Sequence, residues 1–341
     1  MCQRTPGPFM LNKRTVLSEF QKTLSFDRVY TKGRLGEAEI GRATAETLRI
    51  VSWNIGRGYK PDRIAAALAI ISPDVACLQE VDWSNRRTNN RDVLEDLANE
   101  TGMLGLYGIE FLELCSPWRS KNLAGGGAIG NALLSRLAPV NAFRIELPLC
   151  LDWQSDPVDR ALPWVTRWHL RREKRIGRRF AVGAEFAWNG RRLFVCSAHF
   201  EDKLGGVRGR WSQFKAVTQD LETRCSDGAI RVIAGDFNTF DSRTARLVTP
   251  DSEATALGRP AGIAEAAWWQ HALLPATGYT DPFAPSAWTF RVLPFFQAKL
   301  DWIAVQGGCA GACGVGPFAS SDHRPVWLDL QAGGPSASEG R

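Results

Sequence analysis

The chain has 341 residues, of which 44% are hydrophobic, and its 13 Trp and 17 Phe residues can fill a sizeable core in one large domain or two small ones. Lys and Arg exceed Asp and Glu by 42 to 36, a net charge of +6 that favours anionic partners but serves solubility equally well. No apolar run approaches the length of a membrane span, so the sequence argues against stable membrane insertion.

Residues 1–46 are polar and mixed in charge, and we expect an N-terminal extension that is partly helical, over 13–25, or disordered. The N-terminus lacks the apolar segment of a secretory signal. The cysteines are scattered, and Cys77 and Cys196 lie in apolar runs, which fits buried thiols in a reducing compartment. We therefore expect a cytoplasmic protein.

From residue 47 the sequence alternates between apolar runs typical of buried strands and segments typical of helices. LRIVSWNI at 48–55, a helix that begins at 62 and stops at Pro73, and DVACLQEV at 74–81 predict a strand–helix–strand unit. Further strands are expected at 128–135, 179–188, 192–200, 230–238, 299–305 and 324–331, and further helices at 91–102, 210–225 and 265–274. We expect an α/β domain over 47–331, followed by a flexible tail at 332–341.

Apolar strands in this sequence repeatedly end or begin at side chains that can bind a metal or a phosphate. These are Asn54, Glu80, His199, Asp236, Asn238, Asp322 and His323. Each one alone is better explained as a turn residue, a helix cap or a solvated charge. Together they supply the oxygen donors that Mg²⁺ prefers and the acid–base groups that phosphoryl chemistry needs. We assign His169, in an Arg-rich loop, to the solvated surface and His271, in an aromatic helix, to packing.

Seven short motifs, in order, make the chain resemble the endonuclease/exonuclease/phosphatase superfamily. They are SWNI at 52–55, PDVACLQE at 73–80, GNALLSR at 130–136, SAHF at 197–200, GDFN at 235–238, KLDWI at 299–303 and SDHRPV at 321–326. GDFN and SDHRPV are the most specific, and the order of the set carries the inference. The resemblance implies a DNase I-like fold, a four-layer sandwich of two packed mixed β-sheets flanked by helices.

The resemblance also implies a metal-dependent phosphoesterase. Glu80 matches the principal metal ligand of the family, and Asn54 and Asp322 match residues beside the metal and its waters. Mg²⁺ is the expected ion, with Mn²⁺ as the alternative, because all three donors are hard oxygens.

The catalytic roles are carried over in the same way. His323 matches the acid–base residue, oriented by the carboxylate of Asp301, while Asp236 and Asn238 match residues that hold the attacking water and a phosphate oxygen. His199 would contact the phosphate. The family pattern implies direct attack of water on phosphorus, without a covalent intermediate.

Residues that could bind the rest of the substrate are less clearly marked. Asn131 matches a residue at the pocket edge but fits a turn before a strand equally well. Arg171 and Arg175 belong to a basic and aromatic segment at 150–180 that could follow an anionic backbone or could be a solvated loop, which is the commoner use. Trp288 precedes the KLDWI motif, where relatives place a substrate-facing loop.

The substrate therefore remains open at this stage. An anionic phosphate ester is expected, whether nucleic acid, lipid head group or small molecule, and no protein partner is predicted. AP endonuclease activity is disfavoured, because Ile55 and Gly56 stand where those enzymes carry an extra carboxylate. The alternatives are a DNA or RNA nuclease specifically, or a catalytically silent member that only binds an anion.

Overall fold

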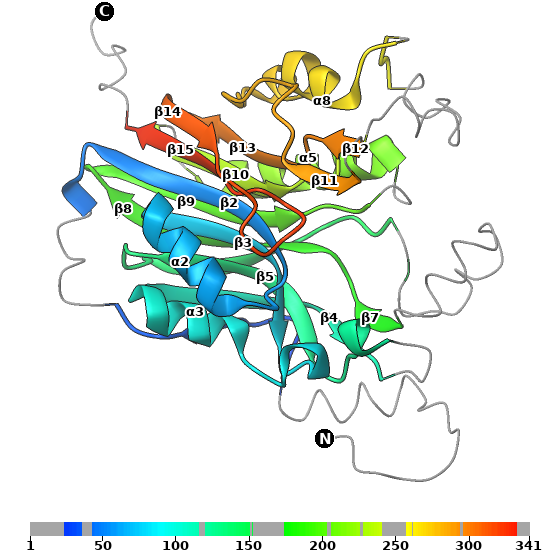
Figure 1. The fold of residues 1–341 in the computed structure, drawn as a ribbon. Coiled ribbons are helices and arrows are strands. Elements are labelled where there is room, and N and C mark those ends of the chain that lie inside the picture. Colours follow the sequence, from blue (N-terminus) through cyan, green and yellow to red (C-terminus); the bar gives the residue numbers. More distant parts are fainter. Residues whose placement is uncertain are drawn as a thin grey trace, which may run out of the picture.

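Two mixed β-sheets form the centre of the computed structural model, which describes residues 24–35, 43–115, 120–150, 152, 174–202, 206–225, 228–240, 257–260, 262–293 and 296–332 (Figure 1). The first sheet has the strand order β1-β4-β5-β3-β2-β15-β14, with β7 also paired to β4. The second has the order β13-β10-β9-β8-β6, and β11 pairs with β12 in a separate hairpin. Both sheets mix parallel and antiparallel pairs.

The strands of the first sheet are β1 (Val29–Lys32), β2 (Thr47–Arg57), β3 (Val75–Trp83), β4 (Leu104–Glu113), β5 (Ala128–Ser135), β7 (Arg175–Gly177), β14 (Cys309–Val315) and β15 (Val326–Gln331). Those of the second sheet are β6 (Asn141–Glu146), β8 (Phe180–Trp188), β9 (Arg191–His199), β10 (Ile230–Asp236) and β13 (Asp301–Gln306). The hairpin consists of β11 (Phe290–Leu293) and β12 (Phe296–Ala298), and the α-helices are α2 (Pro61–Ile71), α3 (Val93–Thr101), α5 (Gly206–Arg224) and α8 (Glu265–Trp268).

The predicted strand–helix–strand unit is confirmed as β2, α2 and β3, with the two strands parallel. Pro61 opens α2 at a position where its missing N–H costs no hydrogen bond. The helix ends at Ser72, which has left-handed backbone angles and donates its N–H to the carbonyl of Leu68. The next helix, α3, is capped by Asp92, whose side chain accepts from the N–H of Glu95 at 3.1 Å.

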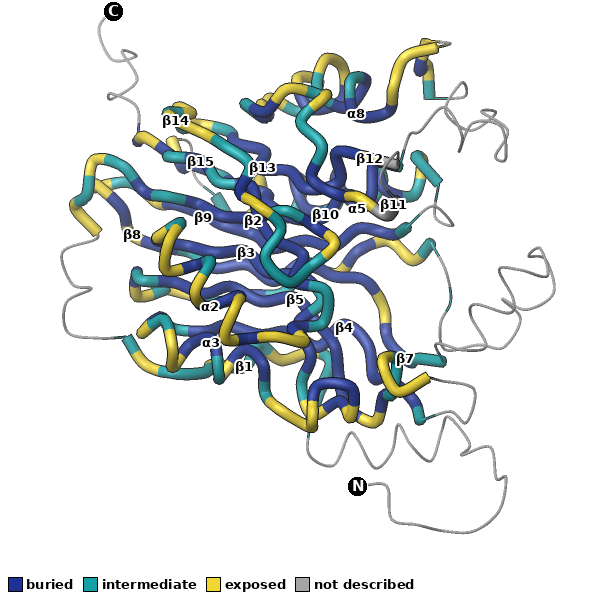
Figure 2. The backbone as a smooth tube through the Cα atoms, viewed as in Figure 1, coloured by how far each residue is buried: buried dark blue, intermediate teal, exposed yellow. Residues whose placement is uncertain are grey.

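Side chains that alternate along the strands divide the core into layers. In β2, Ile50 joins the cluster between the two sheets, while its neighbour Val51 packs with the apolar side of α2 and α3. In β9, Val195 joins the same central cluster, while Phe194 packs with α5. Figure 2 shows the buried strands between helices that expose their outer turns. The predicted four-layer sandwich is therefore confirmed.

Several elements differ from those expected from sequence. β1 lies within the predicted N-terminal extension yet pairs with β4, so the first sheet begins before residue 47. β4, β6, β7 and β14 were not predicted, because Gly, Glu or Arg residues interrupt their apolar patterns. The helix expected at 265–274 is α8 followed by a π-helical turn at Trp269–Leu273. No described helix is long and apolar enough to cross a membrane.

Candidate active site

The strand directions bring the predicted polar residues to one edge of the sandwich. β9 and β10 are parallel, and β13 runs antiparallel to β10, so the register places Asp236 opposite both His199 and Asp301. Gly235 precedes Asp236 at a point where a Cβ would lie 1.8 Å from the carbonyl oxygen of Ala198. A side chain cannot fit there, which explains the glycine of the GDFN motif.

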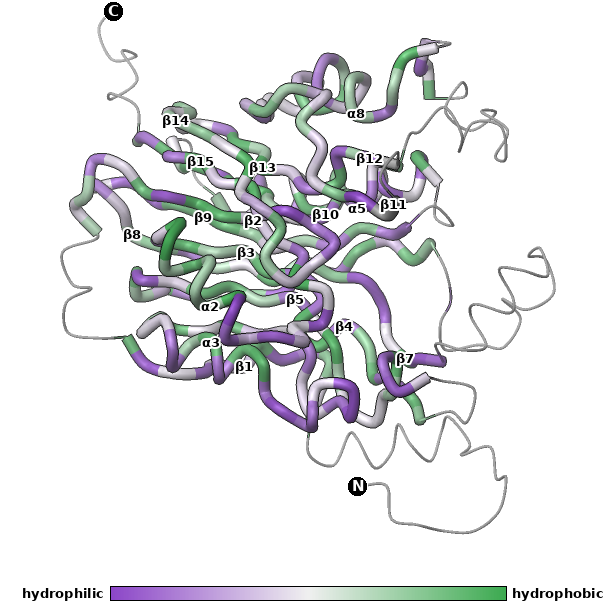
Figure 3. Tube along the Cα trace, in the orientation of Figure 1, coloured by the Kyte–Doolittle hydropathy of each residue, from purple (hydrophilic) through white to green (hydrophobic). Residues whose placement is uncertain are grey.

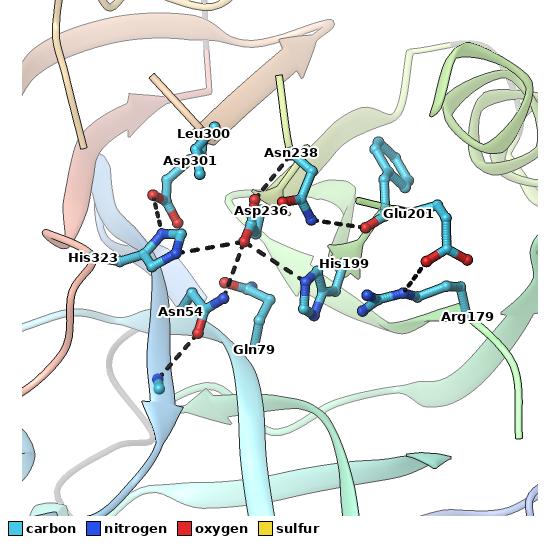
Figure 4. A network of polar contacts seen from close by, with 12 residues as sticks. Asn54, Gln79, Arg179, His199, Glu201, Asp236, Asn238, Leu300, Asp301 and His323 are labelled. Atoms are coloured by element: carbon cyan, nitrogen blue, oxygen red, sulfur yellow. Dashed lines mark hydrogen bonds and ion pairs between the residues drawn. The ribbon is translucent and has the colours of Figure 1, made fainter. Parts of the chain in front are cut away.

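Asp236 is the centre of the polar network (Figure 4). Its carboxylate accepts hydrogen bonds from Asn54 Nδ2 at 3.0 Å and from the backbone N–H of Asn238 at 2.9 Å. Nε2 of His199 and Nε2 of His323 each lie 3.7 Å from Asp236 Oδ2. Burial raises the pKa of Asp236, and the nearby carboxylate of Asp301 adds to the rise although His323 opposes it. The two sheets thus meet at one buried carboxylate.

His323 and Asp301 form a buried dyad. Nδ1 of His323 lies 2.8 Å from Asp301 Oδ2, which leaves Nε2 facing Asp236. Thr289 fixes the start of β13 because its hydroxyl accepts the backbone N–H of Asp301 at 3.0 Å. Burial opposes the charged form of His323, but Asp301 and Asp236 outweigh it and raise the pKa of this histidine to about 10. The ring is therefore held as an imidazolium near neutral pH.

A second buried cluster supports His199, and sequence reasoning missed it. Nδ1 of His199 lies 3.7 Å from Glu110 Oε2, and Arg179 Nη1 donates to Glu110 Oε1 at 3.0 Å. Nε of Arg179 lies 3.5 Å from Glu201 Oε1. Burial, reinforced by the charge of Arg179, holds the pKa of His199 well below its usual value. A carboxylate inside the apolar run LYGIEFLEL was the available sequence signal for Glu110.

Burial makes the ionisation of Glu110 a source of pH-dependent stability. Burial raises its pKa from 4.5 to about 7, although Arg179 opposes the shift. The stabilisation that this group gives to the folded state is complete below pH 4.5 and is lost as the pH rises through 7.

We therefore expect Glu110→Gln to flatten the dependence of stability on pH. Between pH 4.5 and 8 the wild-type protein should lose up to about 3 kcal/mol more unfolding free energy than the variant, at about 1.4 kcal/mol per pKa unit. Urea titrations at a series of pH values would measure this difference. Glu100→Gln, at an exposed position of α3, is the matched control. Parallel curves for wild type and Glu110→Gln would contradict the prediction.

The predicted metal ligands lie at the neighbouring strand ends of the first sheet. Glu80 is half-buried and has a φ of 54°, and the pairing of β3 shifts register beside it on both sides. Such a bulge turns a side chain away from the regular alternation. Burial opposes ionisation of Glu80, but the charges of Arg57 and His323 lower its pKa.

Asn54 and Asp322 are the other two predicted ligands. Asn54 Oδ1 accepts the N–H of Gly56 at 3.0 Å, and a Cβ on Gly56 would lie 3.6 Å from Asp322 Oδ1. The hydroxyl of Ser321 donates to the carbonyl of Asn54 at 2.7 Å and so holds the exposed Asp322 near β2. No three His, Cys, Asp or Glu side chains among the described residues form a metal-binding cluster. The two carboxylates and the amide are the kinds of oxygen donor that Mg²⁺ binds, and this ion usually keeps several of its waters.

Comparison with known proteins agrees with this geometry. Residues 51–326 match the Endonuclease/Exonuclease/phosphatase family. The chain belongs to this family. Its members are usually hydrolases that act on phosphate esters. No curated protein matches the chain at a significant level.

Solved structures share the fold of the family at low sequence identity. An endonuclease/exonuclease/phosphatase from Beutenbergia cavernae is 19% identical, with a TM-score of 0.58 over 85% of this chain and 72% of that one. The human Nocturnin catalytic domain with bound sulfate is 16% identical, with a TM-score of 0.51 over 84% and 94%. D. rerio TDP2 complexed with single-strand DNA product is 16% identical, with a TM-score of 0.51 over 84% of this chain and 100% of that one.

The remaining predicted residues occupy different places in this family fold. Asn131 is fully buried in β5, where Nδ2 donates to the carbonyl of Phe180 at 3.0 Å and so joins the two sheets. Arg175 lies in β7, with its guanidinium 4.2 Å from the ring centre of Phe111. Arg171 lies outside the described residues, as does His169. The substrate-binding roles of Asn131, Arg171, Arg175 and Trp288 stay predictions, as does the solvated position of His169. The prediction that His271 packs in the core of an aromatic helix is wrong, because its side chain is exposed.

Proposed function

We propose that the protein is a Mg²⁺-dependent phosphoesterase that hydrolyses a phosphodiester or phosphomonoester by direct attack of water. The observation that carries the proposal is the buried carboxylate of Asp236 between two imidazoles, with Asn54 and Asn238 bonded to it. Family membership supports hydrolysis of a phosphate ester. The sulfate held by human Nocturnin and the DNA product held by D. rerio TDP2 support an anionic substrate.

Glu80, Asn54 and Asp322 are the residues that would hold the cation. Mn²⁺ is the alternative ion, because it accepts the same oxygen ligands. The bound ion would polarise a phosphoryl oxygen and stabilise the charge that develops on it. Glu80 is suited to this role because nearby positive charges keep it ionised.

The residues of the chain divide the proton chemistry between them. Asp236 is the group able to accept the proton of the attacking water, with Asn238 fixing its carboxylate. His323 begins the reaction protonated, because Asp301 holds its Nδ1, and its Nε2–H can stabilise a phosphoryl oxygen or donate a proton. His199 is neutral and can hydrogen-bond the phosphate from the other side of Asp236.

We also propose that the protein is cytoplasmic, because its scattered cysteines fit a reducing compartment.

Hydrolysis of bis-p-nitrophenyl phosphate tests the proposal. We expect turnover with Mg²⁺, and a rise in Tm with Mg²⁺ concentration, because a cation that binds only the folded state stabilises it. Glu80→Gln should lose both the turnover and the Mg²⁺-dependent rise, since the amide keeps the shape and removes the charge. Glu100→Gln serves as the exposed control.

The alternatives give different results in the same assays. A silent anion-binding member would show no turnover with Mg²⁺ or Mn²⁺ and no metal-dependent rise in Tm. Turnover in Glu80→Gln equal to that of wild type would reject the assignment of the ligand.

A further inference from the structure

The carboxylate proposed as the main metal ligand, Glu80, lies at a strained point of β3. Its φ of 54° is in the left-handed region, which a residue other than glycine adopts at a cost. The regular pairing of β3 is interrupted beside it on both sides, with β2 and with β5. A strained bulge keeps its shape only where neighbouring groups hold it. The position of this carboxylate therefore depends on what fixes the residues next to it.

A tyrosine of β4 holds the residue that directly follows Glu80. The hydroxyl of Tyr107 donates to the carbonyl of Val81 at 2.9 Å, in a buried hydrogen bond. The ring of Tyr107 also meets the indole of Trp83 edge to face, with ring centres 5.5 Å apart and planes at 84°. Tyr107 therefore contacts the end of β3 twice, at the backbone beside Glu80 and at the side chain of Trp83.

Strand β1 supplies two further partners of Trp83. The ring of Tyr30 meets the indole edge to face at 5.1 Å, and Nζ of Lys32 lies 4.1 Å from the ring centre. The same Nζ lies 2.6 Å from Oδ2 of Asp92, the residue that caps α3. Tyr30 and Tyr107 stand directly opposite each other in the antiparallel pair of β1 and β4. Both strands thus contact the same indole.

The loop that follows Trp83 supplies no apolar side chain of its own. All residues at 84–92 are polar (Figure 3). Asp82, which points to the opposite face of β3, is bonded to the buried Arg87 at 2.6 Å. The aromatic partners of the indole therefore come from β1 and β4.

Strand β1 lies outside the part of the chain that matches the family. The match covers residues 51–326, whereas β1 precedes it and forms an edge of the first sheet (Figure 2). The two faces of β1 pack differently: Val29 lies against the cluster between the sheets, and Tyr30 lies against the cluster that contains Val81 and Tyr107. One face of this strand therefore reaches the strand that carries Glu80.

We propose that Tyr30 is a positioning residue for the cation site: through Trp83 and Tyr107 it holds the end of β3, and with it the carboxylate of Glu80. The inference rests on the proposed role of Glu80 as a ligand of Mg²⁺. Each link is a contact between aromatic rings or a buried hydrogen bond, and contiguous contacts of this kind can carry an effect between separate positions. Replacing a group that orients a metal ligand typically weakens binding roughly 10- to 100-fold.

The affinity for Mg²⁺, measured by isothermal titration calorimetry without substrate, tests the inference. We expect Tyr30→Leu to raise the Kd for Mg²⁺ about tenfold, because leucine keeps apolar bulk and removes the ring edge. The kcat for bis-p-nitrophenyl phosphate at saturating Mg²⁺ should stay within about twofold, since the ligand itself is intact. Val29→Ala, on the other face of the same strand, is the matched control and should not change the Kd. Tyr30→Phe keeps the ring and should bind Mg²⁺ as wild type does.

A double-mutant cycle tests whether Tyr30 acts through Trp83. Trp83→Leu should raise the Kd for Mg²⁺ by itself, and Tyr30→Leu added to it should have little further effect, because the contact is already lost. Both side chains are half-buried, so either single variant tests the contact if the other fails to fold. Hydrogen exchange of the metal-free protein should be faster at the amides of residues 80–83 in Tyr30→Leu than in Val29→Ala.

The outcomes separate this inference from the function on which it rests. If wild type and Tyr30→Leu bind Mg²⁺ with the same Kd, or if Val29→Ala raises the Kd equally, the inference is overturned and the assignment of Glu80 as a ligand stands. Additive effects of Tyr30→Leu and Trp83→Leu would overturn it as well. Absence of Mg²⁺ binding by wild type would overturn both the inference and the proposed metal site.

Discussion

His323→Ala should lower kcat for bis-p-nitrophenyl phosphate by roughly 10³-fold, in the range of a lost general acid–base group. The imidazole is buried, is held by Asp301 at 2.8 Å and is directed at Asp236, so a cavity without a proton or a positive charge would remain at the reaction centre. Steady-state kinetics at saturating Mg²⁺ would measure the loss. Asp301→Asn should lower kcat by a smaller factor, because the imidazole ring stays in place with a weaker hydrogen-bond partner.

The control for this prediction is His271→Ala. His271 is exposed on the π-helical turn, outside the network around Asp236. Its replacement should leave kcat within about twofold of the wild-type value. A loss of less than about tenfold in His323→Ala, with the fold intact by circular dichroism, would remove the histidine from the chemistry.

The strand-end pattern in the sequence was enough to predict much of this centre. His199 and Asp236 end the parallel strands β9 and β10, and His323 precedes β15, which runs antiparallel to β2, so the three residues lie at one edge. The same reasoning predicted β2, α2 and β3 because their periodicities are regular. The pattern predicted the edge at which these residues lie, and the roles proposed for them come from the resemblance of the short motifs to the family.

The second layer of the site depends on contacts that sequence periodicity does not encode. Glu110 lies in β4, whose glycines obscure the strand pattern, and its partner Arg179 directly precedes β8. The pairing follows from how the sheets pack, and packing sets which buried charges meet. The bulge that turns Glu80 out of the regular alternation also depends on register with β2 and β5 together.

Lys299 illustrates the same limit at the position before the dyad. The sequence gives no sign of a partner for this lysine, whereas the structure buries Lys299 with its Nζ 2.6 Å from Asp281 Oδ2 and 3.0 Å from the carbonyl of Phe283. The other oxygen of Asp281 accepts the N–H of Ile303 at 3.0 Å. This ion pair therefore ties the strand that carries Asp301 to the segment before β11.

Asp281→Ala should consequently lower the unfolding free energy by about 3–5 kcal/mol, because Lys299 would remain buried without its counter-charge. Denaturant titration would measure the loss. The double variant Asp281→Leu with Lys299→Met should recover much of it, since apolar side chains of similar volume need no counter-charge. Recovery of stability without recovery of kcat would assign the pair a role in placing Asp301 for His323. If Asp281→Ala is as stable as wild type, water must solvate the ammonium group of Lys299, and the ion pair then contributes little to stability.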